Sequence, residues 1–311
     1  MGNAALEERG ANTPVDDRRG YLGGSDASVI LGLNPWKSPT QLYLEKRGEV
    51  EPDDLSENER VQWGNLLEDI VATRYAEVTG KKLRRENRML FHETYPFIAA
   101  HIDRRIVGEH RPLEVKTTGS SAGWGAPYTD EIPEYYYPQV QHYLGVFGGE
   151  QADVAVLIGG NTFRIYHVPR NDQYIDALFR HEAAFWKRVE TGNPPDPATS
   201  AEANLRWPHT RTGQIEVDFD TLLQARELYQ VEQQIKALTA QKDELQTALK
   251  SAMGEDGDTI TYQGARIATW KEQTANRFDT KQFREDHPEL FAEYQKESHS
   301  RVFRFQFKGE E

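Results

Sequence analysis

Two adjacent stretches constrain the fold of this chain most strongly, because together they predict a β-hairpin with charged groups on one face. Residues 97–107 are rich in apolar and β-branched side chains, a turn-forming segment follows, and residues 113–118 alternate in character. Side chains two positions apart in a strand share a face. Glu114 and Lys116 therefore point to one side, their apolar neighbours point to the core, and Asp103 joins the charged face if it lies across the ladder.

Two carboxylates and an amine on one face are suited to holding a divalent metal ion. The acids would repel each other when uncompensated, and a bound Mg²⁺ or Mn²⁺ removes that cost. The lysine supplies a point charge for a water or a phosphate oxygen, as phosphodiester hydrolysis requires. A lone Glu-x-Lys pair on an exposed strand is more often a solvated ion pair, so the flanking sequence has to decide.

Upstream of the hairpin, residues 56–59 read Ser-Glu-Asn-Glu, a capping box that predicts a helix from there through Tyr75. Gly64 and Glu68 lie one turn apart on this helix. The missing side chain at Gly64 would let that face approach the sheet and deliver Glu68 toward the metal. The alternative is an ordinary surface glutamate beside Asp69.

Downstream, Pro138 is suited to the first position of a second helix, on which Gln139 and Tyr143 share a face. A neutral amide there can bind the attacking water or a phosphate without altering the charge of the site. The alternative is a helix with exposed glutamines. Near the amino terminus, two glycines precede Ser25, which predicts that Ser25 caps a short helix able to attract an anion, or is a helix cap and nothing more.

These elements, in this order, resemble the PD-(D/E)xK nuclease superfamily, and among its branches the lambda-exonuclease-like, YqaJ-type viral recombinase family. The motifs that carry the resemblance are Gly64-x-x-x-Glu68, Asp103, Glu114-x-Lys116 and Gln139-x-x-x-Tyr143. Residues 18–27 and 30–36 also look like the amino-terminal motif of that family. The resemblance covers about residues 15 to 190.

The resemblance implies a role for each matching residue. Mg²⁺, or Mn²⁺ as a substitute, would be bound by Glu68, Asp103, Glu114 and the backbone carbonyl of Val115. Lys116 and Gln139 would position and activate water. Arg18 and Ser25, with Tyr143, would contact the DNA phosphate, which is the 5′-terminal one in exonuclease members. Arg18 is preferred to Arg19 for its spacing from Ser25.

The family also implies a fold and an activity. The fold would be α/β, a mixed central sheet flanked by helices in a restriction-endonuclease-like core. The activity would be Mg²⁺-dependent 5′-to-3′ digestion of double-stranded DNA in phage-type recombination, with single strands passed to an annealing protein and a ring trimer as the assembly. Two alternatives remain: a structure-specific or nicking endonuclease of the same fold, and a non-catalytic DNA-binding or scaffold protein that acts through a long carboxy-terminal helix.

Composition limits these readings. With 311 residues, 37% hydrophobic and 28% charged, the chain can bury a full core. No apolar run is long enough for a bilayer and residues 1–14 lack a signal-peptide core, so we expect a cytoplasmic protein, in the bacterial host if phage-encoded. The absence of cysteine excludes the iron–sulfur cluster that some superfamily members carry.

The net charge of −13 opposes DNA binding through counterion release. The distribution is uneven, however, because residues 81–118 hold nine Lys or Arg against five Asp or Glu. The arginines expected to flank the site are Arg84, Arg85, Arg88, Arg104, Arg105 and Arg111. A confined DNA channel is therefore predicted rather than a broad basic surface.

The predicted domains are a nuclease domain at 1–190, a proline-bearing linker at 191–213, and a region at 214–311 with a long helix and a small α+β part. The helix would run from about Asp220 to Gly254 with apolar residues alternately three and four apart, one of them replaced by lysine. A copy of itself, the nuclease domain or another protein could cover this seam. Near the end of the chain, Phe303, Phe305 and Phe307 are expected to pack inward.

Overall fold

The computed structural model describes residues 18–210, 213–297 and 300–307. The predicted lack of a signal-peptide core falls at residues 1–14, outside the described part. The chain divides into two units, Met1–Trp207 and Pro208–Glu311, and the boundary falls inside the segment expected to be a linker. Each unit is treated separately below.

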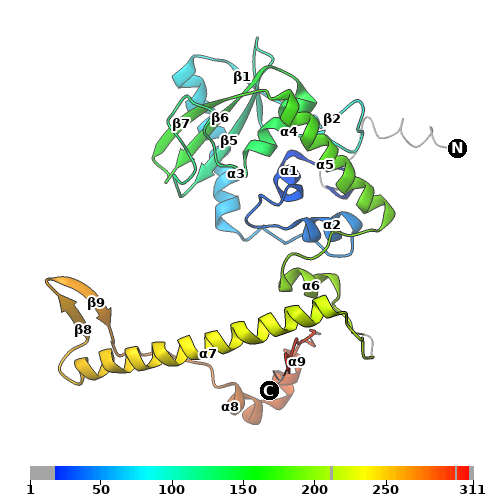
Figure 1. Ribbon diagram of the computed structural model, residues 1–311. Coiled ribbons are helices and arrows are strands. Elements are labelled where there is room, and N and C mark those ends of the chain that lie inside the picture. Colours follow the sequence, from blue (N-terminus) through cyan, green and yellow to red (C-terminus); the bar gives the residue numbers. More distant parts are fainter. Residues whose placement is uncertain (1–17, 211–212, 298–299, 308–311) are drawn as a thin grey trace. The chain divides into compact units, whose positions relative to one another are not determined.

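The first unit is built around a five-stranded mixed sheet with the strand order β1-β4-β5-β6-β7 (Figure 1). Its strands are β1 (Leu83–Arg85), β4 (Arg104–Ile106), β5 (Pro112–Thr118), β6 (Gln151–Ile158) and β7 (Thr162–Pro169). β5 and β6 run parallel, and the other neighbours are antiparallel. A separate two-stranded pair joins β2 (Leu90–Phe91) to β3 (Ala99–Ala100). The expected mixed α/β sheet with flanking helices is confirmed.

The long strand expected at residues 97–107 is divided in the structure. Its first part forms β3, its second part forms β4, and Asp103 lies between them. β4 and β5 form the predicted hairpin, with Arg104 opposite Leu113.

Helix α3 (Glu59–Thr79) covers one face of the sheet. Its buried side chains pack with Leu113 and Val115 of β5, which confirms the predicted inward face of that strand. The predicted helix start was wrong. Asn58 is the N-cap and accepts hydrogen bonds from two backbone N–H groups of the first turn, whereas the backbone N–H of Ser56 donates to Asp54.

Helices α4 (Tyr137–Phe147) and α5 (Asp172–Thr191) lie on the other side of the sheet. α4 forms the crossover between the parallel strands β5 and β6, and α5 packs on α4 (Figure 1). Val140 and Leu144 of α4 and apolar residues of α5 form one core with the even-numbered residues of β6. Because residues of β5 alternate between faces, Glu114 and Lys116 point toward α4.

The amino-terminal part of the unit contributes a short 3₁₀ helix (Arg18–Gly20), α1 (Gly24–Ile30) and α2 (Pro39–Arg47). Ser25 had been predicted to cap α1, and this prediction was wrong. Gly23 is the N-cap, its N–H donates to Asp26 at 3.0 Å, and Ser25 lies inside the first turn. α1 packs against α4 so closely that a Cβ on Gly24 would lie 2.5 Å from Cε1 of Tyr143.

The first unit ends with α6 (Ser200–Arg206). The second unit contains α7 (Phe219–Met253), the hairpin β8 (Thr259–Tyr262) and β9 (Ala265–Thr269), and the short helices α8 (Thr280–Asp286) and α9 (Pro288–Glu293). The expectation for Phe303 was wrong, because its side chain is 77% exposed and its ring stacks on Phe305. In the described part of the chain, no helix combines the length and the apolar character that a membrane crossing needs.

Candidate active site

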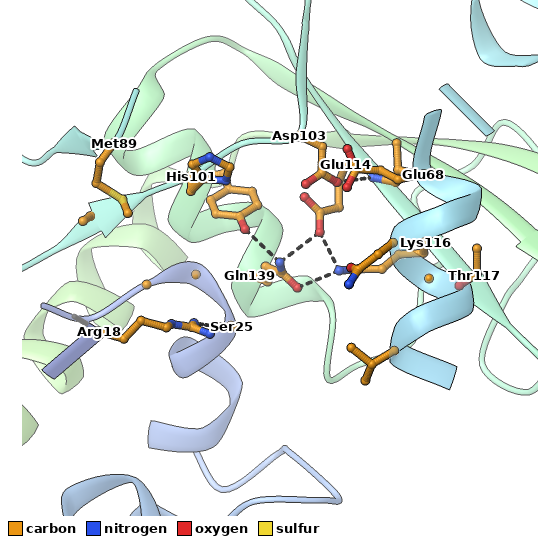
Figure 2. A pocket seen from close by; sticks show the side chains of 18 of the residues that line it. Arg18, Ser25, Glu68, Met89, His101, Asp103, Glu114, Lys116, Thr117 and Gln139 are labelled. Atoms are coloured by element: carbon orange, nitrogen blue, oxygen red, sulfur yellow. Dashed lines mark hydrogen bonds and ion pairs between the residues drawn. The ribbon is translucent and has the colours of Figure 1, made fainter. Parts of the chain in front are cut away.

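A cavity of about 450 Å³ opens between α1, α3, α4 and the edge of β5. All the residues singled out from the sequence line it, although they come from distant parts of the chain (Figure 2). They are Arg18, Ser25, Glu68, Asp103, Glu114, Val115, Lys116, Gln139 and Tyr143. The structure thus brings together every residue of the predicted set, and their chemical roles stay predictions.

A hydrogen bond from a backbone N–H group of β5 holds Asp103 beside this strand. The ladder between β4 and β5 ends at the pair Arg104 and Leu113. The N–H of Val115, which comes next along the edge, donates instead to Oδ2 of Asp103 at 2.8 Å. The carboxylate therefore stands in place of a strand partner, which fixes it next to Glu114.

Glu114 is 4% exposed and lies in a network of side-chain bonds between β5 and α4. Its Oε1 accepts from Nζ of Lys116 at 2.5 Å and from Nε2 of Gln139 at 2.9 Å. The side-chain oxygen Oε1 of Gln139 accepts from Nζ of Lys116 at 3.1 Å. Nε2 of Gln139 also donates to the hydroxyl of Tyr143 at 2.9 Å. Figure 2 shows Gln139 at the centre of this network. The amide thereby links the acid, the amine and α4.

Electrostatics in this pocket favour a protonated acid and a charged lysine. Burial is the main cause that raises the pKa of Glu114 to about 8, and the charge of Asp103 adds to it. Burial also raises the pKa of Asp103, against the opposing effect of Lys116. Burial alone would lower the pKa of Lys116, but the charges of Glu114 and Asp103 outweigh it and raise that pKa above its usual value. Lys116 therefore stays an ammonium group.

Glu68 lies on the wall of the cavity but is paired with Arg104. Nη1 of Arg104 donates to Oε1 of Glu68 at 2.7 Å, and its Nη2 bonds to Asp69. Among the described residues, no three His, Cys, Asp or Glu side chains are grouped closely enough to hold a metal ion. Arg104 pairs with Glu68, and Lys116 pairs with Glu114.

The donor atoms nevertheless fit a hard divalent cation. Oε2 of Glu114 is buried and has no hydrogen-bond partner, although buried carboxylate oxygens are normally satisfied. Asp103 and Glu114 line the same cavity, and the charge of Asp103 adds to the burial that raises the pKa of Glu114, which is the situation that a cation relieves. The two acids and the Val115 carbonyl would hold such an ion, and Glu68 would join them after it leaves Arg104. All these ligands are oxygen atoms, as Mg²⁺ and Mn²⁺ prefer.

Arg18 and Ser25 are close together at the opposite side of the cavity. Nη2 of Arg18 donates to Oγ of Ser25 at 2.8 Å, and both side chains are exposed. Arg19 instead forms an ion pair with Glu51 at 2.6 Å. Arg18 therefore lines the cavity, whereas its role as the phosphate-contacting arginine stays a prediction.

Two residues near the site were missed in the sequence. His101 lines the cavity, and its position two residues before Asp103 was the available signal. The ring of Tyr136 lies 4.9 Å from Nζ of Lys116 and makes a cation–π contact. Three consecutive tyrosines directly before Pro138 were the available signal for Tyr136.

The basic surface expected around the site is smaller than its residue count implied. Asp69 pairs with Arg85 and Arg104, and Glu86 pairs with Arg88 and Arg105. Arg111 pairs with Asp153 and Glu109. The neighbouring carboxylates therefore neutralise much of the positive charge of these arginines.

Comparison with known proteins places the chain in a family. Residues 15–150 match the YqaJ-like viral recombinase domain. The protein named "Uncharacterized protein YqaJ" of Bacillus subtilis (strain 168) is 42% identical over 298 residues, which is 92% of this chain and 91% of that protein. The chain therefore belongs to the YqaJ family, and the resemblance found in the sequence is confirmed.

Several solved structures are similar to part of the chain. The alkaline exonuclease LHK-Exo of Laribacter hongkongensis has 17% identity and a TM-score of 0.47, over 57% of this chain and 91% of that one. The structure of LHK-Exo in complex with dAMP has 19% identity and a TM-score of 0.48, over 57% of this chain and 91% of that one. A phage-related exonuclease of Haemophilus somnus 129PT has 15% identity and a TM-score of 0.44, over 55% of this chain and 94% of that one.

Proposed function

We propose that this protein is a Mg²⁺-dependent deoxyribonuclease that digests double-stranded DNA from its 5′ end. One observation carries the proposal: acids from α3, the β4 edge and β5 meet Lys116, Gln139 and an Arg18–Ser25 pair at a single cavity. Membership of the YqaJ family, whose domain is described as a viral recombinase, supports it. A buried carboxylate oxygen without a partner is costly in a purely structural role and useful in a metal site.

In the proposed reaction, water attacks the phosphorus atom in line with the leaving oxygen. The new oxygen–phosphorus bond forms as the bond between phosphorus and the 3′ oxygen breaks. The attacking water gives one proton to bulk water, and the leaving 3′ oxygen takes one proton from bulk water to become a hydroxyl group. A divalent cation, when bound, would neutralise charge on the phosphate and acidify water. Lys116, fixed by Glu114 and Gln139, would stabilise charge that develops on the phosphoryl oxygens.

Gln139 has a second task in this scheme, because it orients groups without adding charge. Its amide holds Oε1 of Glu114 and so leaves Oε2 directed to another ligand. Its carbonyl oxygen holds the ammonium of Lys116 at a set position. Replacement of this amide would loosen both groups at once.

The Arg18–Ser25 pair would receive the phosphate of the DNA end. A guanidinium beside a hydroxyl supplies several donors to one anion, and it lies at the same cavity as the acids. Acidic net charge and the pairing of the flanking arginines favour such a confined end-binding site over a broad DNA-binding surface. A ring trimer and delivery of single strands to an annealing protein remain predictions from the family, and a cytoplasmic location remains a prediction from the sequence.

The test is digestion of end-labelled linear duplexes in Mg²⁺, with and without a 5′-phosphate, beside covalently closed circles. We expect rapid release of nucleotides from 5′-phosphorylated ends, no cutting of closed circles, and loss of activity with a chelator. Cutting of closed circles would instead indicate an endonuclease of the same fold.

Lys116→Ala is the decisive variant, and Lys187→Ala, an exposed lysine on α5, is its matched control. We expect the first to lose cleavage with its fold intact and the second to match the wild type. Full digestion by both Lys116→Ala and Glu114→Ala would show that the activity does not come from this site. Absence of Mg²⁺-dependent digestion by the wild type would leave the scaffold function, in which the acids are inert.

A further inference from the structure

Helix α7 buries almost none of its surface. It has 35 residues, and among its described side chains Met253 is the buried one. Apolar residues nevertheless recur along one face with exposed fractions between 37% and 63%. They are Leu228, Val231, Ile235, Leu238, Leu245 and Leu249. We call them, together with Lys242 and Ala252, the α7 seam.

The spacing of the α7 seam specifies the shape of its partner. Its residues alternate three and four apart over four heptads, with Leu228 at an a position and Val231 at a d position. A repeat of 3.5 residues keeps one narrow stripe facing a neighbour, which is how two helices pack knobs into holes. The surface therefore fits another helix with the same repeat, and a second copy of the chain brings one.

The charge of α7 argues against a nucleic acid as the partner. The helix carries four Lys or Arg and five Asp or Glu, so it offers no excess of positive charge to a phosphate backbone. Six exposed apolar residues in one line are also not what a phosphate-tracking helix presents.

Charge also selects the direction of the two helices. In a parallel, in-register pair, Lys242 would face Lys242 of the other copy inside the seam, and Glu227 at a g position would face Glu232 at an e position. Both contacts oppose like charges. An antiparallel pair avoids them, because it sets a positions against d positions.

We propose that two copies of this chain associate through α7 in an antiparallel coiled coil centred at residue 240. In this register every seam residue has a partner: Leu228 meets Ala252, Val231 meets Leu249, Ile235 meets Leu245, and Leu238 meets Lys242. The stem of Lys242 packs on Leu238 while its ammonium reaches solvent. This association is independent of the nuclease function, because none of these residues lines the cavity.

The first test uses introduced cysteines. Because the natural chain has no cysteine, a disulfide can form only between introduced thiols. Full-length chains with Val231→Cys, with Leu249→Cys and with both are oxidised mildly and run on non-reducing gels. The two positions are 18 residues apart, about 27 Å along one helix, so they cannot join within a chain. We expect a covalent dimer from the double variant and from an equal mixture of the single variants, and none from either single variant alone.

Two outcomes overturn the proposal. Cross-linking of Val231→Cys with itself would show parallel helices, and no cross-link in any sample would show that something other than a second copy covers the seam. The second test is sedimentation of full-length Leu238→Asp beside Ala240→Asp, an exposed position on the opposite face of the helix. We expect at least tenfold weaker self-association through α7 for the first, wild-type association for the second, and unchanged DNA digestion by both.

Discussion

Replacing Glu114 by glutamine keeps the shape of a buried side chain and removes its charge, so it separates what this acid does for catalysis from what it costs the fold. In the metal-free protein the carboxylate is buried beside Asp103, with one oxygen unpartnered. We therefore expect Glu114→Gln to abolish cleavage and at the same time to stabilise the metal-free protein.

The size of the effect follows from the raised pKa. Burial, assisted by Asp103, moves the pKa of Glu114 from 4.5 to about 8 in the folded protein. An acid whose pKa is raised by folding costs no stability below pH 4.5, where it is protonated in both states. Stability is lost as pH rises from 4.5 to about 8, by roughly 1.4 kcal/mol per pH unit, or about 3 kcal/mol at pH 7.

The assay is urea unfolding in chelator, followed by tryptophan fluorescence at pH 7 and pH 5. Because the chain has two units, the comparison uses the transition whose midpoint Mg²⁺ shifts in the wild type. We expect Glu114→Gln to exceed the wild type by about 3 kcal/mol at pH 7 and by less than about 1 kcal/mol at pH 5.

Addition of Mg²⁺ should raise the midpoint of the wild type and leave that of Glu114→Gln unchanged. Glu77→Gln, an exposed glutamate of the same helix that carries Glu68, is the control and should behave as the wild type. The reasoning is refuted if Glu114→Gln is the less stable protein at pH 7, or if its advantage does not shrink at pH 5.

Three further perturbations test neighbouring contacts. Tyr136→Leu, which removes the ring near Lys116, should slow single-turnover cleavage about 3- to 30-fold while Tyr136→Phe does not, and equal rates would contradict the cation–π contact. Tyr75→Phe removes the 2.5 Å bond to buried Asp153 and should cost roughly 1.5 to 3 kcal/mol at pH 7. Burial would raise the pKa of Asp153, but the hydrogen bonds from Tyr75 and its other partners hold this pKa below 3.8. The difference in unfolding free energy between the wild type and Tyr75→Phe should therefore become smaller in urea titrations as the pH falls below 3.8. A difference that does not change with pH would contradict this reasoning. Gly24→Ala should lower stability by about 1 to 3 kcal/mol in thermal unfolding, because its methyl meets Tyr143, whereas Gly20→Ala, which meets nothing, should be neutral.

Strand alternation was the most reliable guide to the site. The period of two along β5 predicted that Leu113 and Val115 enter one core, and it placed Glu114 and Lys116 on the other face. Family motifs then named Gln139 as the residue that meets them, and the crossover helix α4 does bring it there. Periodicity works here because one face of β5 enters an apolar core while Glu114 and Lys116 on the other face line the cavity.

Short-range signals and ion pairs were less predictable. Ser56 and Asn58 are both good caps, two residues apart, and the sequence does not show which will carry the first turn of α3. The pairing of Arg104 with Glu68 joins residues 36 apart, so it depends on tertiary structure. The same limit applies to the basic cluster, whose arginines were counted as free charges until their carboxylate partners were visible.

Gly24 has a consequence for how this site can vary. It precedes Ser25 on α1 and touches Tyr143, which stands one turn beyond Gln139 on α4. A single added carbon would push the two helices apart. The close packing at Gly24 therefore fixes the position of Ser25 relative to Gln139 in the cavity. For the proposed nuclease, the interval between where a strand is held and where it is cut is thus set by the smallest side chain available.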